Sequence, residues 1–424
     1  MSLQTAITGL MVAQTGIDTT SNNLANANTT AYKSQTALFE SLFPQENGNT
    51  KPGTGASVEG MSDDLTEGSL TSTGNSLDAA IEGNGYFVIS SNGTQQYTRD
   101  GAFQLSNTGQ IETLNGSAVQ GYSEVNGSLS GSLGALMVNT GSIGATATSK
   151  VGLALNLNSG DTVIAPTTAN PPGPAFNPSN SATYSETTSV TAYDAQGNAN
   201  RVQLYLVNNG SNNWGVYAVP QTASGGSVNA STGSGTPSTS PVNLGTLSFN
   251  TSGQLTSSQP LSMNVTWPNA SGTSGSSGSS AISFDFTGTT NMAQTFAVSS
   301  LTNNGSAPGA YSGVSIGSDG SVEASYTNGQ TLSVGKIAIA NFINPEGLTP
   351  MSGNLYAQSN NSGTPVVGQA GTGQAGTLKG GELEASNVST SNMLVSLIQY
   401  QQAYEANTSV IQTEQQDSQR LLQI

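Results

Sequence analysis

The sequence predicts a multidomain α+β protein in which helices from the two chain ends form a stem and two nested, mainly β domains fill the middle. Three observations point to this class. An apolar stripe of heptad spacing runs along the N-terminal end, a similar stripe runs along the C-terminal end, and turn signals with alternating apolar residues dominate the region between them.

The N-terminal stripe repeats every seven positions. Its members are Leu3, Leu10, Ile17, Leu24 and Ala31, with Ala6, Ala13 and Ala27 on the other half of the same face. Small side chains at this spacing are typical of a narrow, coiled-coil-like seam. No proline precedes Pro44, so nothing in this stretch prevents a long helix.

The C-terminal stripe has a similar design. Its members Met393, Leu397, Tyr400, Tyr404 and Ile411 follow one another at steps of three, four or seven, and Leu421 and Leu422 close the run. Neither glycine nor proline occurs from Glu382 to Ile424. Because such thin stripes do not stabilise isolated helices, we predict that the two ends pair, that the pairs pack against other copies, and that both ends become ordered on assembly.

This interpretation assigns a subunit interface to the two stripes. The predicted interface residues are Leu3, Leu10, Ile17, Leu24, Met393, Leu397, Tyr400, Tyr404 and Ile411. An apolar stripe is more often ordinary core, and the pattern alone favours that interpretation. The position of both stripes at the extreme ends, around a middle of different character, favours the assembly interface.

The middle of the chain is predicted to be β-rich. Turn signals such as Asn92-Gly93 and Asp100-Gly101 separate short strands between residues 86 and 113, which predicts a meander. A second block contains strands at 189–194, 202–207 and 213–219 and a strict alternation of Leu261, Met263, Val265 and Trp267. Residues 44–75 are predicted to be mostly irregular because proline and glycine punctuate them.

These patterns divide the chain into four nested parts. Residues 1–35 and 383–424 form the terminal helical domain, and residues 36–76 and 359–382 form connectors. Residues 77–150 and 301–358 form a first β domain, and residues 151–300 form an inserted outer β domain. The symmetric order of helix, connector and β segments is what suggests the nesting.

Composition excludes several functions. Charged residues make up 8% of the chain and the net charge is −16, so nucleic-acid binding, which needs clustered Lys and Arg, is not expected. The absence of Cys and His removes disulfides, thiolate chemistry, imidazole bases and nearly all zinc sites. No catalytic residue, cofactor, metal or small-molecule substrate is predicted.

The sequence also contains an acidic cluster and lacks membrane-spanning and signal segments. Glu59, Asp63, Asp64 and Glu67 form an acidic cluster whose spacing matches no calcium loop, so a solvated loop is expected. No apolar run is long enough for a transmembrane helix, and the N-terminus lacks the features of a cleaved signal peptide. The Ser-, Thr-, Gly- and Asn-rich composition is nevertheless typical of secreted proteins.

A polar motif interrupts the N-terminal stripe. Residues 21–33 read Ser-Asn-Asn-Leu-Ala-Asn-Ala-Asn-Thr-Thr-Ala-Tyr-Lys, which predicts the frayed, capped end of the helix. This motif resembles the N-terminal signature of the bacterial flagellar rod and hook family. The signature residues are Asn22, Asn23, Leu24, Asn26, Asn28, Thr29, Tyr32 and Lys33.

The resemblance extends along the chain. Residues 77–88, 97–103, 383–388 and 402–407 are similar to further segments of the family, and residues 188–198 and 214–217 resemble the outer domain of its hook members. Ala31, where the family often has Gly, and Ser389, where it usually has an acid, depart from the pattern.

The resemblance implies a structural subunit that polymerises into a short, curved, flexible tube and transmits motor torque. It also implies contacts with rod proteins, the hook cap, hook–filament junction proteins and the export apparatus, and an extracellular place in the flagellum reached without a cleaved signal peptide. A distal rod protein of the same family and a secreted adhesin or surface-layer protein are the alternatives. An enzyme is not expected.

Overall fold

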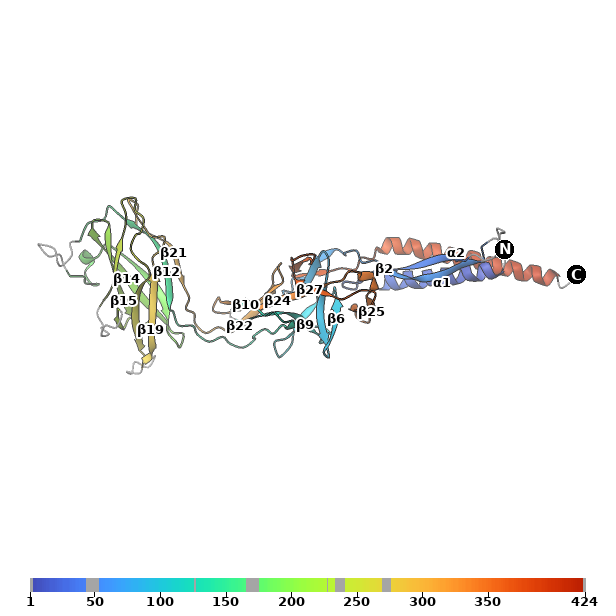
Figure 1. Cartoon of the computed structure of the whole chain (residues 1–424), viewed down its shortest axis with the longest axis horizontal. Coiled ribbons are helices and arrows are strands. Elements are labelled where there is room, and N and C mark those ends of the chain that lie inside the picture. The colour runs from blue at the N-terminus through green and yellow to red at the C-terminus, as the bar shows by residue number, and fades with distance from the viewer. Residues whose placement is uncertain are drawn as a thin grey trace. The chain divides into compact units, whose positions relative to one another are not determined.

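The computed structural model describes residues 3–42, 53–125, 127–164, 175–226, 228–232, 241–268 and 276–421. The chain forms two compact units (Figure 1). Unit 1 comprises Met1–Thr140, Ser312–Ser325 and Thr331–Ile424, and unit 2 comprises Gly141–Tyr311 and Tyr326–Gln330. The chain therefore leaves unit 1, builds unit 2 and returns, so the predicted α+β class with nested, mainly β parts and a pair of terminal helices is confirmed.

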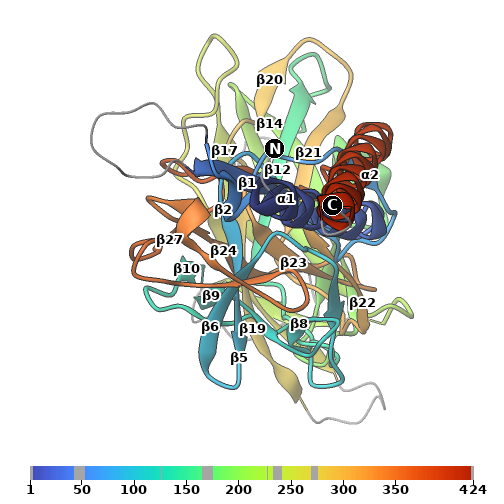
Figure 2. The ribbon, with the colours of Figure 1, turned by 90° about the vertical axis from the view of Figure 1, so that its right-hand side faces the viewer.

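The two helices of unit 1 are α1 (Leu3–Ala25) and α2 (Thr390–Leu421), and they lie side by side (Figure 2). A Cβ added to Gly9 would lie 2.8 Å from the side chain of Asn407, and one added to Gly16 would lie 2.6 Å from the ring of Tyr400. Asn23 Nδ2 lies 3.8 Å from the sulfur of Met393. Each step of seven along α1 is thus a step of seven back along α2, which is an antiparallel heptad register. Leu422, expected to close the C-terminal stripe, lies outside the described residues.

The seam between the helices is made of small residues. Ala6, Ala13 and Gly16 are buried on α1, whereas no residue of α2 from 390 to 420 is fully buried. Neither helix is long and apolar enough, within the described residues, to cross a membrane. The close approach of Gly9 and Gly16 to α2 therefore takes the place of a wide apolar interface.

A two-stranded hairpin packs on α1, which corrects the prediction that residues 44–75 are mostly irregular. The hairpin consists of β1 (Gln35–Leu42) and β2 (Gly55–Asp63), and β3 (Leu70–Ser72) follows it. Phe39 meets Tyr400 edge-on with 6.4 Å between ring centroids, and Thr19 Oγ1 lies 3.7 Å from the sulfur of Met61. An isolated hairpin is only marginally stable in water, so these tertiary contacts stabilise the hairpin. The local sequence at 44–75 does not show such contacts, which is why it did not predict the strands.

Most of the remainder of unit 1 belongs to a sheet with thirteen strands among the described residues, in the order β22-β23-β24-β9-β5-β6-β26-β25 with five strands paired off this path. Its strands are β5 (Tyr86–Ser91), β6 (Thr94–Thr98), β7 (Phe103–Leu105), β8 (Ile111–Thr113), β9 (Ala118–Val125), β10 (Ser128–Leu129), β11 (Gly134–Ala135), β22 (Tyr311–Ile316), β23 (Ser321–Tyr326), β24 (Thr331–Asn341), β25 (Thr349–Met351), β26 (Leu355–Ala357) and β27 (Val366–Gln369). The predicted short strands at 86–113 are confirmed by β5 to β8, but the predicted meander is wrong. The strands form two separate hairpins, β5 with β6 and β7 with β8, because β26 from the second half of the chain pairs with β6 in the place that β7 would take. Tyr86, Tyr97 and Phe342 pack edge-on in the core beside these strands.

Short strand pairs join the chain ends to this sheet region. The strand β4 (Ala79–Glu82) pairs with β28 (Thr377–Gly380), and β3 pairs with β29 (Glu382–Glu384). A 3-10 turn, η2 (Pro345–Gly347), precedes β25. Part of the expected connector at 359–382 is therefore extended, because β4 from the first half of the chain completes the hydrogen bonds of β28.

Unit 2 is a sandwich of two sheets. One sheet contains β12 (Lys150–Asn158), β16 (Asn229–Ser231), β18 (Leu261–Pro268), β19 (Ser276–Asp285), β20 (Thr290–Met292) and β21 (Ala297–Asn303); the other contains β13 (Glu186–Tyr193), β14 (Ala199–Gly210), β15 (Asn213–Gln221) and β17 (Val242–Ser248), with η1 (Ser181–Thr183) before it. One apolar core joins the sheets and includes Trp214 from one and Trp267 from the other. The predicted alternation is confirmed, since Met263, Val265 and Trp267 all point into this core.

The contact between Gly16 and Tyr400 predicts unequal effects of the same substitution at two glycines. Gly16→Ala places a methyl group against a ring held by Phe39, so we expect a loss of about 1–3 kcal/mol. Gly9→Ala meets only the flexible end of Asn407 and gains up to about 1 kcal/mol of helix propensity. The measurement is the melting temperature of the helical circular dichroism signal in assembled protein; equal melting temperatures would contradict this helix register.

Candidate functional site

The family-like motif builds the connection between α1 and the hairpin. Asn23, which is 2% exposed, donates from Nδ2 to the carbonyl of Gln35 at 2.7 Å, and its Oδ1 accepts from the Gln35 amide at 2.9 Å and from the Tyr32 hydroxyl at 3.0 Å. A single amide therefore fixes the end of the helix to the start of β1. This placement agrees with the predicted capped helix end.

The other signature residues form the turn itself. Asn26 Nδ2 donates to Asn22 Oδ1 at 3.2 Å, and the Thr29 hydroxyl donates to Asn26 Oδ1 at 3.1 Å. Leu24 is half-buried and Asn28 is exposed. Ala31 lies beyond the helix, with φ 56, and its amide donates to the carbonyl of Glu384 at 2.8 Å. The expectation that Ala31 continues the helical stripe is therefore wrong, because the asparagine-rich turn ends the helix at Ala25.

A buried ion cluster lies where the two chain ends meet the β fold. The carboxylate of Glu384 accepts from Lys33 Nζ at 2.6 Å and from Arg99 Nε at 2.9 Å, and its side chain is fully buried. The amide of Gly68 donates to the same carboxylate at 2.9 Å. We call Lys33, Arg99 and Glu384 the junction triad.

The triad is enclosed by backbone carbonyls. Lys33 Nζ also donates to the carbonyl of Thr66 at 2.6 Å. The guanidinium of Arg99 donates to the carbonyls of Gly83 and Gly85, each at 2.8 Å, and to that of Ile81 at 3.3 Å. Such saturation is what a buried ion cluster requires, since an unpaired charge in a low dielectric is strongly destabilising.

Burial and pairing act in opposite directions on these charges. Burial lowers the pKa of Lys33, against the effect of its bond to Glu384. Burial alone would raise the pKa of Glu384, but the charge of Arg99 and the bonds from Lys33 and Gly68 hold that pKa below its usual value. The carboxylate is therefore ionised near neutral pH and serves as the common counter-ion of both cations.

A second residue of the C-terminal segment reinforces the junction. Asn387 Oδ1 accepts from the amide of Ser34 at 2.8 Å, and its Nδ2 donates to the carbonyl of Asp64 at 2.8 Å. Glu384 and Asn387 both belong to the stretch at 383–388 whose likeness to the family was noted above. The two family-like motifs at opposite ends of the chain thus bind each other.

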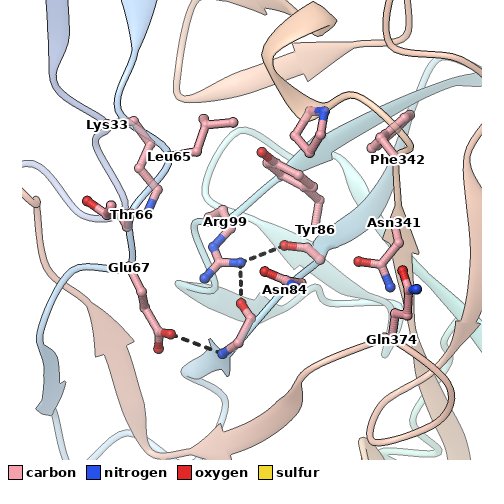
Figure 3. A pocket seen from close by; sticks show the side chains of 13 residues that line it. Lys33, Leu65, Thr66, Glu67, Asn84, Tyr86, Arg99, Asn341, Phe342 and Gln374 are labelled. Carbon is pink, nitrogen blue, oxygen red and sulfur yellow. Dashed lines mark hydrogen bonds between the residues drawn. The ribbon is translucent and has the colours of Figure 1, made fainter.

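A cavity of ≈310 Å³ opens beside the triad, and its lining includes Lys33, Arg99, Glu67, Asn84 and Tyr86 (Figure 3). Glu67 accepts from the amide of Gly83 at 3.0 Å, and burial raises the pKa of Tyr86 to about 12. No group of three acidic side chains that could hold a metal ion occurs within the described ranges. Asp63, Asp64 and Glu67 instead accept hydrogen bonds from amides, which are the side-chain amide of Gln35 and the backbone amides of Thr66 and Gly83.

The stripes of predicted interface residues fall on different faces of the helix pair. Met393 and Tyr400 point at α1, and Leu397, Tyr404 and Ile411 are half-buried beside them. Leu10, Ile17 and Leu24 flank the seam half-buried, whereas Leu3 is 45% exposed. Their role in contacts between copies stays a prediction.

Sequence reasoning missed the residues that hold the junction together. Arg99 and Glu384 lie in the family-like stretches at 97–103 and 383–388, but neither stretch by itself predicts the ion pair between them. Gly9 and Gly16, which form the seam with Ala6 and Ala13, were also missed. The available signal was that Gly9, Gly16 and Asn23 share a heptad position.

Comparison with known proteins places this arrangement in a family. Four family models match consecutive parts of the chain: "Flagella basal body rod protein" at residues 3–33, "Flagellar hook protein FlgE/F/G D1 domain" at 80–150, "Flagellar basal body protein FlaE D2 domain" at 156–306 and "Flagellar basal body rod FlgEFG protein C-terminal" at 379–424. The flagellar hook protein FlgE of Escherichia coli K12 is 33% identical over 424 residues, covering 98% of both chains. The chain belongs to the flagellar hook protein FlgE family.

Other hook proteins agree. The FlgE protein of Rhizobium meliloti is 32% identical over 97% of this chain and 96% of its own. The crystal structure of the Helicobacter pylori flagellar hook protein FlgE2 superposes with a TM-score of 0.52 at 15% identity, over 74% of this chain and all of that one, which supports the fold. A member of the hook family is a structural subunit of the flagellar hook, so the adhesin alternative is set aside.

The junction triad predicts a large stability effect from a nearly isosteric change. Glu384→Gln leaves two buried cations without a counter-ion, so we expect the unfolding free energy of unit 1 to fall by about 3–5 kcal/mol. The exposed pair of Lys379 and Glu82 is the matched control, and Lys379→Gln is expected to change that free energy by less than about 1 kcal/mol. Denaturant unfolding measures both, and equal losses would refute the role of the triad.

Acid titration checks the same variant independently. Because the pKa of Glu384 lies below its ordinary value of 4.5 in the folded chain, its stabilising contribution is complete above pH 4.5 and is lost as pH falls through the folded pKa. The stability difference between the natural chain and Glu384→Gln should therefore shrink on acidification. A difference that stays constant would show that the carboxylate charge is not what stabilises the junction.

Proposed function

We propose that this hook subunit polymerises into a short, curved, flexible tube that transmits motor torque, with the paired terminal helices lining its interior. The observation that supports this proposal is that the two helices bury little apolar surface against each other in a single subunit. The seam consists of small residues, no residue of α2 from 390 to 420 is fully buried, and large apolar side chains remain exposed on both helices.

The energetics favour ordering on assembly. Helices are stabilised in proteins mainly by packing of an apolar face, and this pair buries alanine, glycine and threonine rather than leucine. Additional copies can cover the exposed side chains Ile7, Met11 and Ile398 and thereby offset the entropy of ordering the ends. A weakly ordered chain end also suits passage through a narrow export channel.

We further propose that each of the four parts of the chain occupies its own layer of the tube. Residues 1–35 and 383–424 would form the inner core, residues 36–76 and 359–382 the connectors, residues 77–150 and 301–358 the first β domain, and residues 151–300 the outer domain. The hydroxyl-rich sequence of the inserted part, which has no charged residue between Arg201 and Asp285, supports polar, hydrated contacts between copies there.

The partners and the route follow from the same proposal. We infer contacts with rod proteins, the hook cap, the hook–filament junction proteins and the flagellar export apparatus, and export to the cell exterior without a cleaved signal peptide. No enzymatic activity is proposed. The charged groups of the junction triad bind each other and backbone carbonyls, which suits a structural role rather than proton transfer.

The proposal is tested by introducing a charge into each stripe. Leu10→Asp or Leu397→Asp buries a carboxylate beside the seam, so we expect a soluble, β-rich monomer that does not polymerise. Ser21→Asp and Gln412→Asp add the same charge at exposed positions of the same helices and should still polymerise. Electron microscopy of concentrated protein is the measurement, with curved tubes expected for the natural chain; normal tubes from both stripe variants would contradict the assignment.

A further inference from the structure

Two apolar patches remain uncovered on the helix pair. The α1 patch consists of Leu3, Ile7 and Met11, which are 45%, 39% and 62% exposed. Their spacing of four places them on the face of α1 opposite Gly9 and Gly16, away from α2. Large side chains this exposed on one stripe of a helix mark a surface that another molecule covers.

The α2 patch consists of Leu394, Val395 and Ile398, which are 48%, 55% and 52% exposed. It lies on the face of α2 opposite Met393, Tyr400 and Asn407, which point at α1. Within the subunit, α1 therefore faces α2 with small and polar residues, and α2 faces α1 with Met393, Tyr400 and Asn407. Both helices present large apolar residues outward.

Charge restricts what these patches can meet. The chain carries a net charge of −16, so two copies repel wherever their acidic surfaces approach each other. Residues 3–17 and residues 385–404 contain no charged side chain, and the two patches lie within these two segments. These neutral stretches are where one copy can approach another without bringing like charges together.

The antiparallel register places the two patches at different positions along the axis of the helix pair. With Gly16 opposite Tyr400, Val395 lies opposite residue 21 of α1, whereas the α1 patch is centred on Ile7. At 1.5 Å per residue, the patches are separated by about 20 Å along the helix axis. Two copies can therefore join them only when one is displaced along that axis.

We propose that the α1 patch of one copy packs against the α2 patch of the next copy, with the two copies displaced by about 20 Å along the helix axis. The contact rests on the proposed polymerisation and specifies which surfaces carry it. Because the two patches are different, the contact is heterologous, and the displacement along the axis prevents it from closing into a ring. Repetition of the contact therefore generates an open helical assembly.

The test uses the absence of cysteine from the natural chain. In the double variant Ile7→Cys/Val395→Cys, the two thiols of one chain are about 20 Å apart, too far for an internal disulfide. Oxidation of assembled protein should therefore produce a ladder of dimers, trimers and larger covalent species on a non-reducing gel. The single variants Ile7→Cys and Val395→Cys should remain monomeric under the same conditions.

Matched controls separate a specific contact from random collision. Ser21→Cys/Val395→Cys keeps the α2 thiol and moves the α1 thiol about 20 Å along the exposed side of α1, away from the α1 patch, and should give no ladder. A second pair, Met11→Cys/Leu394→Cys, tests the same contact with the substitutions moved along each patch, and should give the same ladder.

The outcomes discriminate between the contact and the function. Dimers from either single variant would mean that a patch meets its own copy, and they would overturn the proposal. Polymers seen by electron microscopy without a ladder from either double variant would also overturn it while leaving the proposed function intact. If the natural chain forms no polymer at all, the proposed function fails and this contact fails with it.

Discussion

The organisation of unit 1 depends on one buried carboxylate. Glu384 comes from the C-terminal segment, Lys33 from the end of the N-terminal motif and Arg99 from the β region, and the three charges meet where water is excluded. None of them can be left unpaired there without a large loss of stability. The junction therefore forms as a whole, and it brings together segments 351 and 285 residues apart in the chain.

The two sides of the junction differ in how they are stabilised. On the β side, long ladders and aromatic cores such as that of Tyr86, Tyr97 and Phe342 bury large side chains. On the helical side, glycine and alanine form the seam and large apolar residues stay outside. Local stability therefore changes at the junction. The β region of unit 1 is well packed within a single subunit, whereas the helices α1 and α2 depend on assembly for their stability.

Much of the fold could be predicted from periodicity. The helices at both ends, the short strands at 86–113 and the alternating strand of Trp267 are all local patterns that the structure reproduces, whereas the pairing of β6 with β26 is not local and was not predicted. The hairpin of β1 and β2 could not be predicted, because its stability comes from contacts of Phe39 with Tyr400 and of Met61 with Thr19. The junction triad was equally out of reach, since periodicity carries no information about which distant charges become neighbours. The heptad pattern also predicted a helical conformation at Ala31, but the asparagine-rich turn after Ala25 gives this residue a positive φ instead.

The most direct test of this difference in local stability is hydrogen exchange on the free subunit, compared with the polymer. The account predicts slow exchange at the amides of Ala31 and Gly68, which donate to Glu384, in both states. It predicts fast exchange along α1 and α2 in the free subunit and slow exchange there only in the polymer. Helix amides already as protected as those of the β strands in the free subunit, or junction amides exchanging as fast as the helices, would contradict it.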